Sequence, residues 1–216
     1  MHSIDIGANA SRVDTMLEAG GPVVAILGVM SVIGLAVVLI KTWQFFRLDI
    51  DKRNFIPPAL QAWRDNNLSE MKQILAGSRS PIARVIEVAT DACLHAKTDS
   101  ALAREEVLRV ATLHLANARS YLRILEVIAA LSPLLGLFGT VLGMIEAFHR
   151  LEEAGTTVDP AVLSGGIWEA LLTTAAGLAV AIPAILLLNW LEQRIENFKL
   201  AMEDAMTQIF TASLGS

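Results

Sequence analysis

The stretch that decides the fold is Ser132-Pro133-Leu134-Leu135-Gly136-Leu137-Phe138-Gly139-Thr140-Val141-Leu142-Gly143-Met144. It lies inside an apolar run from Val127 to His149 whose only charge is Glu146. Two more such runs occur, one from Pro22 to Ile40 and one from near Ala161 to Trp190. A helix needs about 20 apolar residues to cross a bilayer core. We therefore predict an all-α membrane protein with three transmembrane helices, at residues 21–41, 127–149 and 165–190.

The composition agrees with a membrane protein. The chain has 216 residues, of which 54% are hydrophobic and 18% are charged. A soluble domain has about 45–50% apolar and about 25% charged residues. The net charge of −5 does not fit the basic footprint of a nucleic-acid-binding protein, so we expect no nucleic-acid partner. A single cysteine, Cys93, excludes an intramolecular disulfide framework.

Basic residues predict the orientation, because they mark the cytoplasmic side of a membrane protein. Thirteen of the 17 Lys and Arg residues lie between Lys41 and Arg123, and none lies in residues 151–164. We therefore expect an N-terminal segment over residues 1–20 on the outer side of the membrane and a cytoplasmic helical domain over residues 42–126. An outer loop over residues 150–164 and a cytoplasmic C-terminal helix over residues 191–216 complete the layout.

The cytoplasmic segments read as helices. Residues 59–75 predict a short helix pair with a turn at Asn66-Asn67, and Pro81 opens the next helix after a loop over residues 77–80. No glycine or proline interrupts residues 101–132, so we expect one continuous rod there. In the tail, apolar residues recur at helical spacing on one face. They are Ile195, Phe198, Met202, Met206 and Ile209.

Small residues form a face on each of the last two spans. The second span repeats Gly136, Thr140, Gly143 and Ala147, with Gly139 and Gly143 making a GxxxG pair. The third span repeats Gly166, Ala170, Thr174, Gly177, Ala181 and Ala184. Such faces let helix backbones approach closely, or leave room for another helix or for water. We expect both a packing and a pore-facing role for these positions.

Depth in the bilayer groups the polar residues of these spans. At 1.5 Å per residue, Thr140 lies about 3 Å and Thr174 about 5 Å outward of the midplane. The same arithmetic places Glu146 and Glu169 about 12–13 Å outward. We interpret Glu146 as an interfacial acid. Because an intramembrane acid is costly unless it is paired or hydrated, we interpret Glu169 as functional.

The remaining intramembrane features are two prolines, and the chain has no enzyme signature. Pro133 and Pro183 each remove a backbone donor, which makes them candidate hinges. The sequence has no P-loop, HExxH motif, CxxC pair or nucleophile elbow. We therefore expect neither an enzyme nor a bound cofactor or metal.

Two motifs resemble a known family. Residues 132–144 resemble the second-span signature of the MotA/TolQ/ExbB proton-channel family, and residues 169–178 with 181–184 resemble its third-span signature. The resemblance implies a pentameric ring in the bacterial inner membrane whose channel holds a dimer of an ExbD-like or TolR-like single-span protein. It also implies that Thr140, Thr174 and Glu169 line the lumen. Since Thr173 adjoins Thr174, both hydroxyls remain candidates for the proton pathway.

The resemblance is greater to ExbB than to TolQ, so we expect an ExbB-type function and keep two alternatives. An ExbB-type subunit would use the proton motive force to act through a TonB-like protein and support TonB-dependent uptake. A TolQ-type subunit would act through a TolA-like protein in the Tol-Pal envelope system. The second alternative is a passive membrane scaffold, which proton flux in a reconstituted complex would distinguish from the other two.

Overall fold

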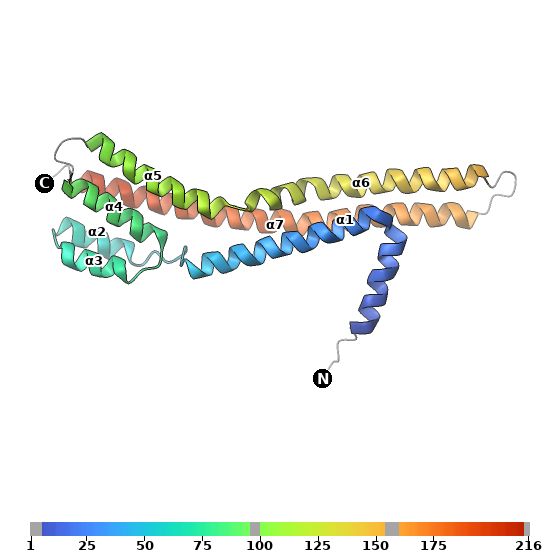
Figure 1. Cartoon of the computed structure of the whole chain (residues 1–216), viewed down its shortest axis with the longest axis horizontal. Coiled ribbons are helices and arrows are strands. Elements are labelled where there is room, and N and C mark those ends of the chain that lie inside the picture. The colour runs from blue at the N-terminus through green and yellow to red at the C-terminus, as the bar shows by residue number, and fades with distance from the viewer. Residues whose placement is uncertain (1–5, 96–99, 154–159, 214–216) are drawn as a thin grey trace. The chain divides into compact units, whose positions relative to one another are not determined.

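The computed structural model describes residues 6–95, 100–153 and 160–213, and within these ranges the regular structure is entirely α-helical (Figure 1). The helices are α1 (Ile6–Arg47), α2 (Ile56–Arg64), α3 (Leu68–Ala76), α4 (Pro81–His95), α5 (Ser100–Arg119), α6 (Leu122–Glu153) and α7 (Pro160–Ser213).

The chain divides into two compact units. The span unit consists of the described residues up to Val38 together with Tyr121–Leu188. The bundle unit consists of Leu39–Ser120 and the described residues from Asn189 onward. Helices α1 and α7 each contribute to both units, so the predicted third span and the predicted tail helix lie on one continuous helix.

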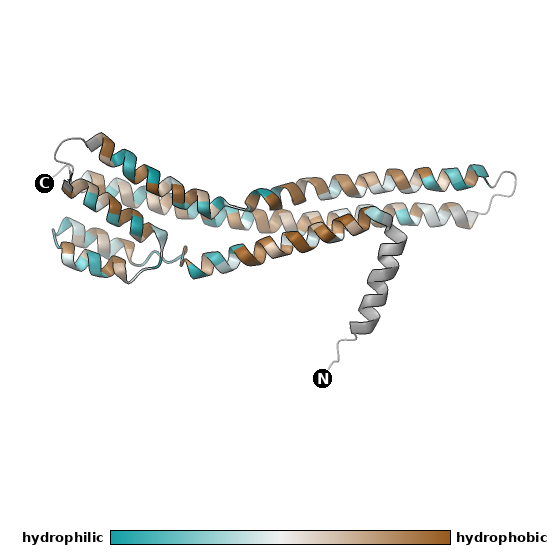
Figure 2. Cartoon of the chain, viewed as in Figure 1, coloured by the Kyte–Doolittle hydropathy of each residue, from teal (hydrophilic) through white to brown (hydrophobic). Residues whose placement is uncertain are grey.

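Within the described ranges, three helices have the length and hydropathy to cross a membrane, as the sequence predicts. They comprise Gly21–Arg47, Leu122–Glu153 and Leu163–Ala212. Figure 2 shows hydrophobic residues along α6 and along α1 after residue 21, whereas α2 to α5 alternate hydrophobic with hydrophilic positions. Many large apolar side chains of α6 are exposed in the single chain, among them Leu134, Phe138 and Phe148. Lipid or neighbouring subunits must cover them, because a monomer in water would not leave so much apolar surface open.

In the span unit, α1 changes direction at Gly21. This residue has φ +58°, a left-handed conformation that glycine adopts without steric cost, and Pro22 then opens the apolar segment. Farther along, α1 packs on α6, where a Cβ at the buried Gly34 would lie 3.5 Å from the side chain of Ile128. The span unit is thus a three-helix arrangement in which α1 packs against α6.

In the bundle unit, α2 packs on α3, α3 on α4 and α4 on α5. The carboxyl-terminal part of α7 supplies the core with Ile195, Phe198, Met202, Met206 and Ile209, all of which are buried. Trp63 Nε1 donates a hydrogen bond of 3.4 Å to the carbonyl oxygen of Ile209, which joins α2 to α7. The predicted helix pair, the start of α4 at Pro81 and the apolar face of the tail are confirmed.

The prediction of one rod over residues 101–132 is wrong. Helix α5 ends at Arg119 and α6 begins at Leu122, and between them Tyr121 has φ +66°. The end of α5 is stabilised from another helix, since Lys41 Nζ donates to the carbonyl oxygens of Asn117 (3.2 Å) and Ala118 (3.0 Å) and to Ser120 Oγ (3.0 Å). A buried ammonium group therefore satisfies carbonyls that a helix end leaves unpaired.

Candidate functional site

Helices α6 and α7 lie side by side and antiparallel in the span unit, and their small residues form a close seam (Figure 1). A Cβ added at Gly177 would lie 2.6 Å from the carbonyl oxygen of Ser132, and one added at Gly136 would lie 3.0 Å from that of Thr173. Both neighbours are backbone atoms, which cannot move without shifting a helix. The two glycines therefore mark a close approach of the two helix backbones.

The seam continues from this point toward the carboxyl-terminal end of α6. A Cβ at Gly139 would lie 2.7 Å from Thr173 Oγ1, and one at Gly143 would lie 3.3 Å from the Cβ of Ala170. Gly166 meets Ala147 in the same way. Ala170, Ala181 and Ala184 of α7 are also buried. The glycines and alanines of the two predicted faces thus pack α6 against α7 within one chain.

Thr173 lies in the seam. It is 3% exposed, and its Oγ1 donates 2.7 Å to the carbonyl oxygen of Ala170 and lies 3.3 Å from that of Gly136. Both oxygens belong to the packed helices. The hydroxyl is therefore satisfied inside the chain and is covered on all sides by α6 and α7.

Thr140 and Thr174 lie beside the seam rather than in it. Thr174 is half-buried, and its Oγ1 lies 3.5 Å from the carbonyl oxygen of Gly136. The hydroxyl of Thr140 donates 2.6 Å to the carbonyl oxygen of Leu137, and the residue lines a shallow groove on α6 with Val141 and Met144. Both hydroxyls bond to helix carbonyls and retain an accessible side.

Helical geometry places these two threonines on one side of the α6–α7 pair. At about 100° per residue, Thr140 is rotated about +40° and Ile128 about −80° from Gly136 around the axis of α6. Around the axis of α7, Thr174 is rotated about +60° and Glu169 about −80° from Gly177. Because the helices face each other and are antiparallel, rotations of the same sign turn toward the same side of the pair. Ile128 contacts α1 at Gly34, so we call its side the α1 side and the side of Thr140 and Thr174 the open side.

Glu169 lies on the α1 side and is half-buried. Its Oε1 approaches Gly21, with 4.0 Å to the position of a Cβ there. Gly21 precedes the apolar segment of α1, and the amino-terminal end of a helix favours negative charge. The kink of α1 thus gives a favourable electrostatic environment to an acid near the start of α7. Because Glu169 lies on the α1 side, it is separated from the two threonines of the open side.

The other intramembrane polar residue and the two prolines have ordinary surroundings. Glu146 is exposed and forms an ion pair of 3.0 Å with Arg150, in keeping with its interpretation as an interfacial acid. Helices α6 and α7 continue through Pro133 and Pro183 respectively. A hinge at either proline stays a prediction.

The sequence reasoning missed Ser132. This residue is fully buried, its hydroxyl donates 2.6 Å to the carbonyl oxygen of Ile128, and its own carbonyl faces Gly177. The signal was present, since Ser132 precedes Gly136 by four residues and so continues the same face.

Comparisons with known proteins show which family the chain matches. The sequence profile of the MotA/TolQ/ExbB proton channel family matches residues 77–204, which is more than half of the chain. The chain is 50% identical over 66 residues to the biopolymer transport protein exbB1 of Vibrio cholerae, which covers 31% of this chain and 29% of that protein. It is 42% identical over 85 residues to the biopolymer transport protein ExbB of Salmonella typhimurium, covering 39% and 34%.

A third relative matches over a longer stretch. The chain is 29% identical over 174 residues to the putative biopolymer transport protein ExbB-like 3 of Synechocystis, which covers 79% of this chain and 80% of that protein. The matches to the Vibrio and Salmonella proteins, in contrast, span about a third of the length of those relatives.

Proposed function

Because the chain belongs to the MotA/TolQ/ExbB proton channel family, we propose that it is the channel subunit of an ExbB-type motor in the bacterial inner membrane. That family is one of proton channels and not of enzymes. Five copies form a ring around a dimer of a single-span, ExbD-like partner. Proton flow through the ring drives motion that a TonB-like protein passes to the outer membrane for TonB-dependent uptake.

One observation carries this proposal: Thr140 and Thr174 share the open side of the α6–α7 pair, opposite α1. With that side toward the ring axis, both threonines line the lumen and α1 faces lipid. The apolar side chains exposed on α1, such as Val29, Val32 and Leu35, suit contact with lipid. In this arrangement Thr173 packs α7 against α6, and the hydroxyl of Thr174 faces the lumen.

Threonine hydroxyls suit proton transfer along water. A hydroxyl both donates and accepts hydrogen bonds, so a layer of ten hydroxyls, two from each of five subunits, orders water without fixing a charge. The absence of a fixed charge also leaves an inner helix dimer free to turn. Each proton that moves inward releases about 2.3 kcal/mol per 100 mV of membrane potential.

Glu169 has a different role from the threonine layer. It lies on the α1 side near the kink at Gly21. The proposed orientation then puts it in the outer part of the span. Five such acids at one level collect protons from the outer side of the membrane and bond to a neighbouring subunit. We assign the N-terminus to the periplasm and the C-terminus to the cytoplasm, in keeping with the distribution of basic residues.

Two measurements on the detergent-purified protein test this function. Native mass is recorded with and without a co-expressed single-span partner, and a monomer in both preparations would contradict the ring. Proton flux is then measured in vesicles that contain the complex, under an imposed membrane potential. A complex that assembles and conducts no protons would show that the chain is a scaffold.

A further inference from the structure

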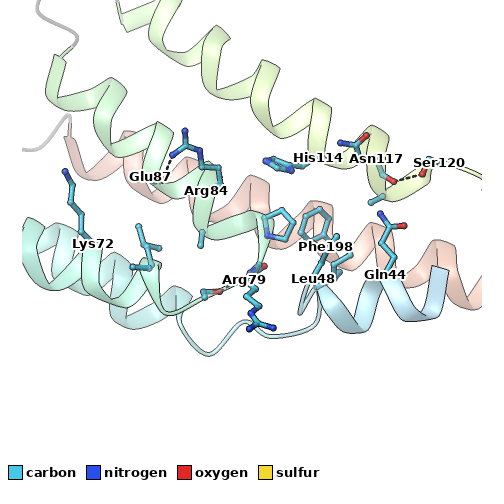
Figure 3. Close-up of a pocket in the computed structure, with 18 residues that line it drawn as sticks. Gln44, Leu48, Lys72, Arg79, Arg84, Glu87, His114, Asn117, Ser120 and Phe198 are labelled. Carbon is cyan, nitrogen blue, oxygen red and sulfur yellow. Dashed lines mark hydrogen bonds and ion pairs between the residues drawn. The ribbon is translucent and has the colours of Figure 1, made fainter. Parts of the chain in front are cut away.

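A cavity of about 730 Å³ lies inside the bundle unit, apart from the span residues that carry the proposed function (Figure 3). The loop between α3 and α4 borders it, together with α4, α5, the end of α1 and Phe198 of α7. Leu48, Ile50, Leu75 and Phe198 give it an apolar part. Its lining also contains polar residues from three elements, among them Arg79 of the loop, Arg84 of α4 and His114 of α5, which Figure 3 labels.

The cavity carries an excess of positive charge. Its lining contains Lys72, Arg79 and Arg84 but only one acid, Glu87, which leaves a net charge of two positive units when His114 is neutral. Arg84 bonds to Glu87 at 2.5 Å, so the charges of Lys72 and Arg79 are the ones that this acid does not balance. The lining of the cavity is thus positively charged, although the whole chain has a net charge of −5.

Ser80 supplies a buried donor that the protein itself does not use. Among the described residues, Ser80 Oγ is the one buried side-chain oxygen or nitrogen without a hydrogen-bond partner, although the residue is only 3% exposed and lines the cavity. A serine in this position before a helix ordinarily accepts a bond from the first turn. A buried hydroxyl without a partner is costly, and an acceptor from a ligand would remove that cost.

The backbone around Ser80 also favours an anion. Helix α4 has 15 residues and begins at Pro81, directly after Ser80, so its positive amino-terminal end lies at the cavity. The amide of Ser80 donates 3.2 Å to Ser78 Oγ, which holds both serines of the loop at this end. Cavity, excess charge, unused hydroxyl and helix end coincide in one place.

We propose that this cavity binds a phosphate group, as a phosphomonoester or a phosphodiester. The phosphate oxygens accept hydrogen bonds from the hydroxyl of Ser80 and from the side chain of Arg79, its neighbour in the loop, and Lys72 adds to the positive charge of the lining. Arg suits this role because its guanidinium group donates two parallel bonds to one phosphate. The apolar part of the cavity accommodates the organic group that the phosphate carries, which belongs either to a soluble compound or to an anionic phospholipid.

Binding to the full-length, delipidated protein in detergent tests the site at pH 7.5. The probes are inorganic phosphate and glycerol 3-phosphate, followed by calorimetry, and phosphatidylglycerol, followed by native mass spectrometry. Chloride at equal ionic strength and phosphatidylcholine serve as the reference ligands. We expect Arg79→Gln and Ser80→Ala each to weaken binding by about tenfold, the loss typical of one hydrogen bond to a charged group. Arg109→Gln and Ser69→Ala, which change exposed residues outside the cavity, are the matched controls.

Thermal unfolding separates a binding role of Ser80 from a structural one. Because Ser80→Ala removes an unsatisfied buried hydroxyl, the variant without ligand should unfold at the same temperature as the parent or higher, and it should lose the stabilisation that the ligand gives. Binding of the soluble phosphates alone supports the site and shows that its ligand is a soluble compound. Binding of phosphatidylglycerol alone supports the site and shows that its ligand is a phospholipid. Binding no tighter than the reference ligands, or binding that the Ser80 and Arg79 substitutions leave unchanged, overturns the proposal.

Discussion

Gly177 approaches Ser132 so closely that a single added carbon would lie 2.6 Å from the serine carbonyl oxygen. Because this oxygen belongs to the backbone of α6, relief requires that one helix shift against the other. We predict that Gly177→Ala destabilises the protein by about 1–3 kcal/mol, as overpacking a close contact does. Unfolding in detergent measures the loss. Gly165→Ala on the same helix is the control, since no atom of another helix lies within 4 Å of its added carbon. Equal stability of the two variants would contradict the seam.

Lys41 should be essential to the bundle unit. Its ammonium group bonds to Gln44 Oε1 (2.8 Å) and to three oxygens at the end of α5, and its side chain is fully buried. Lys41→Met keeps the shape but leaves the carbonyls of Asn117 and Ala118 without this donor. We expect a loss on the order of 2–3 kcal/mol, together with faster hydrogen exchange near the end of α5. Lys52→Met, at an exposed pair with Asp49, should have little effect.

His114 predicts a pH dependence of the bundle unit. Burial, and then the charge of Arg84, lower the pKa of His114 below its ordinary value near 6.5. A histidine with a lowered pKa in the folded state binds fewer protons than in the unfolded state, so stability is full above pH 6.5 and falls as pH decreases below it. The melting temperature should therefore fall between pH 7.5 and pH 5.5. His114→Gln should make this fall smaller. An unchanged slope in the variant would show that other groups cause it.

Glu169 should be needed for activity and not for assembly. Glu169→Gln keeps the size and the hydrogen bonding of the side chain but cannot titrate. We predict an assembled ring with strongly reduced energy transduction, measured with the partner at its normal level. Glu146→Gln is the matched control, because Glu146 is exposed and paired with Arg150. Wild-type activity in the Glu169 variant would contradict this role and show that Glu169 is an ordinary interfacial residue.

The three spans, the small-residue faces and the amphipathic tail are predictable from the sequence because each depends on local periodicity. The break at Ser120-Tyr121 is not, since neither residue is a glycine or a proline. The end of α5 depends on Lys41, which lies 77 residues before Ala118 in the chain. Such a contact leaves no local signal.

The phase of the small-residue faces is also ambiguous from sequence. Spacings of three and four residues fit two neighbouring phases of a helix, so Gly136 and Gly143 can be joined through either Gly139 or Thr140. In the structure the seam passes through Gly139 and Thr173, which leaves Thr140 and Thr174 beside it. Only packing between helices distinguishes the two phases.

Proton flux through Thr174→Val compared with Thr173→Val tests the central claim most directly. The two threonines are adjacent and the substitution is the same, but Thr173 is 3% exposed in the seam and Thr174 lies on the open side. In vesicles that contain the ring and its single-span partner, we predict strongly reduced flux for Thr174→Val and near-normal flux for Thr173→Val. Thr207→Val, in the part of α7 within the bundle unit, should conduct normally. Normal flux for Thr174→Val in a fully assembled ring would contradict the account.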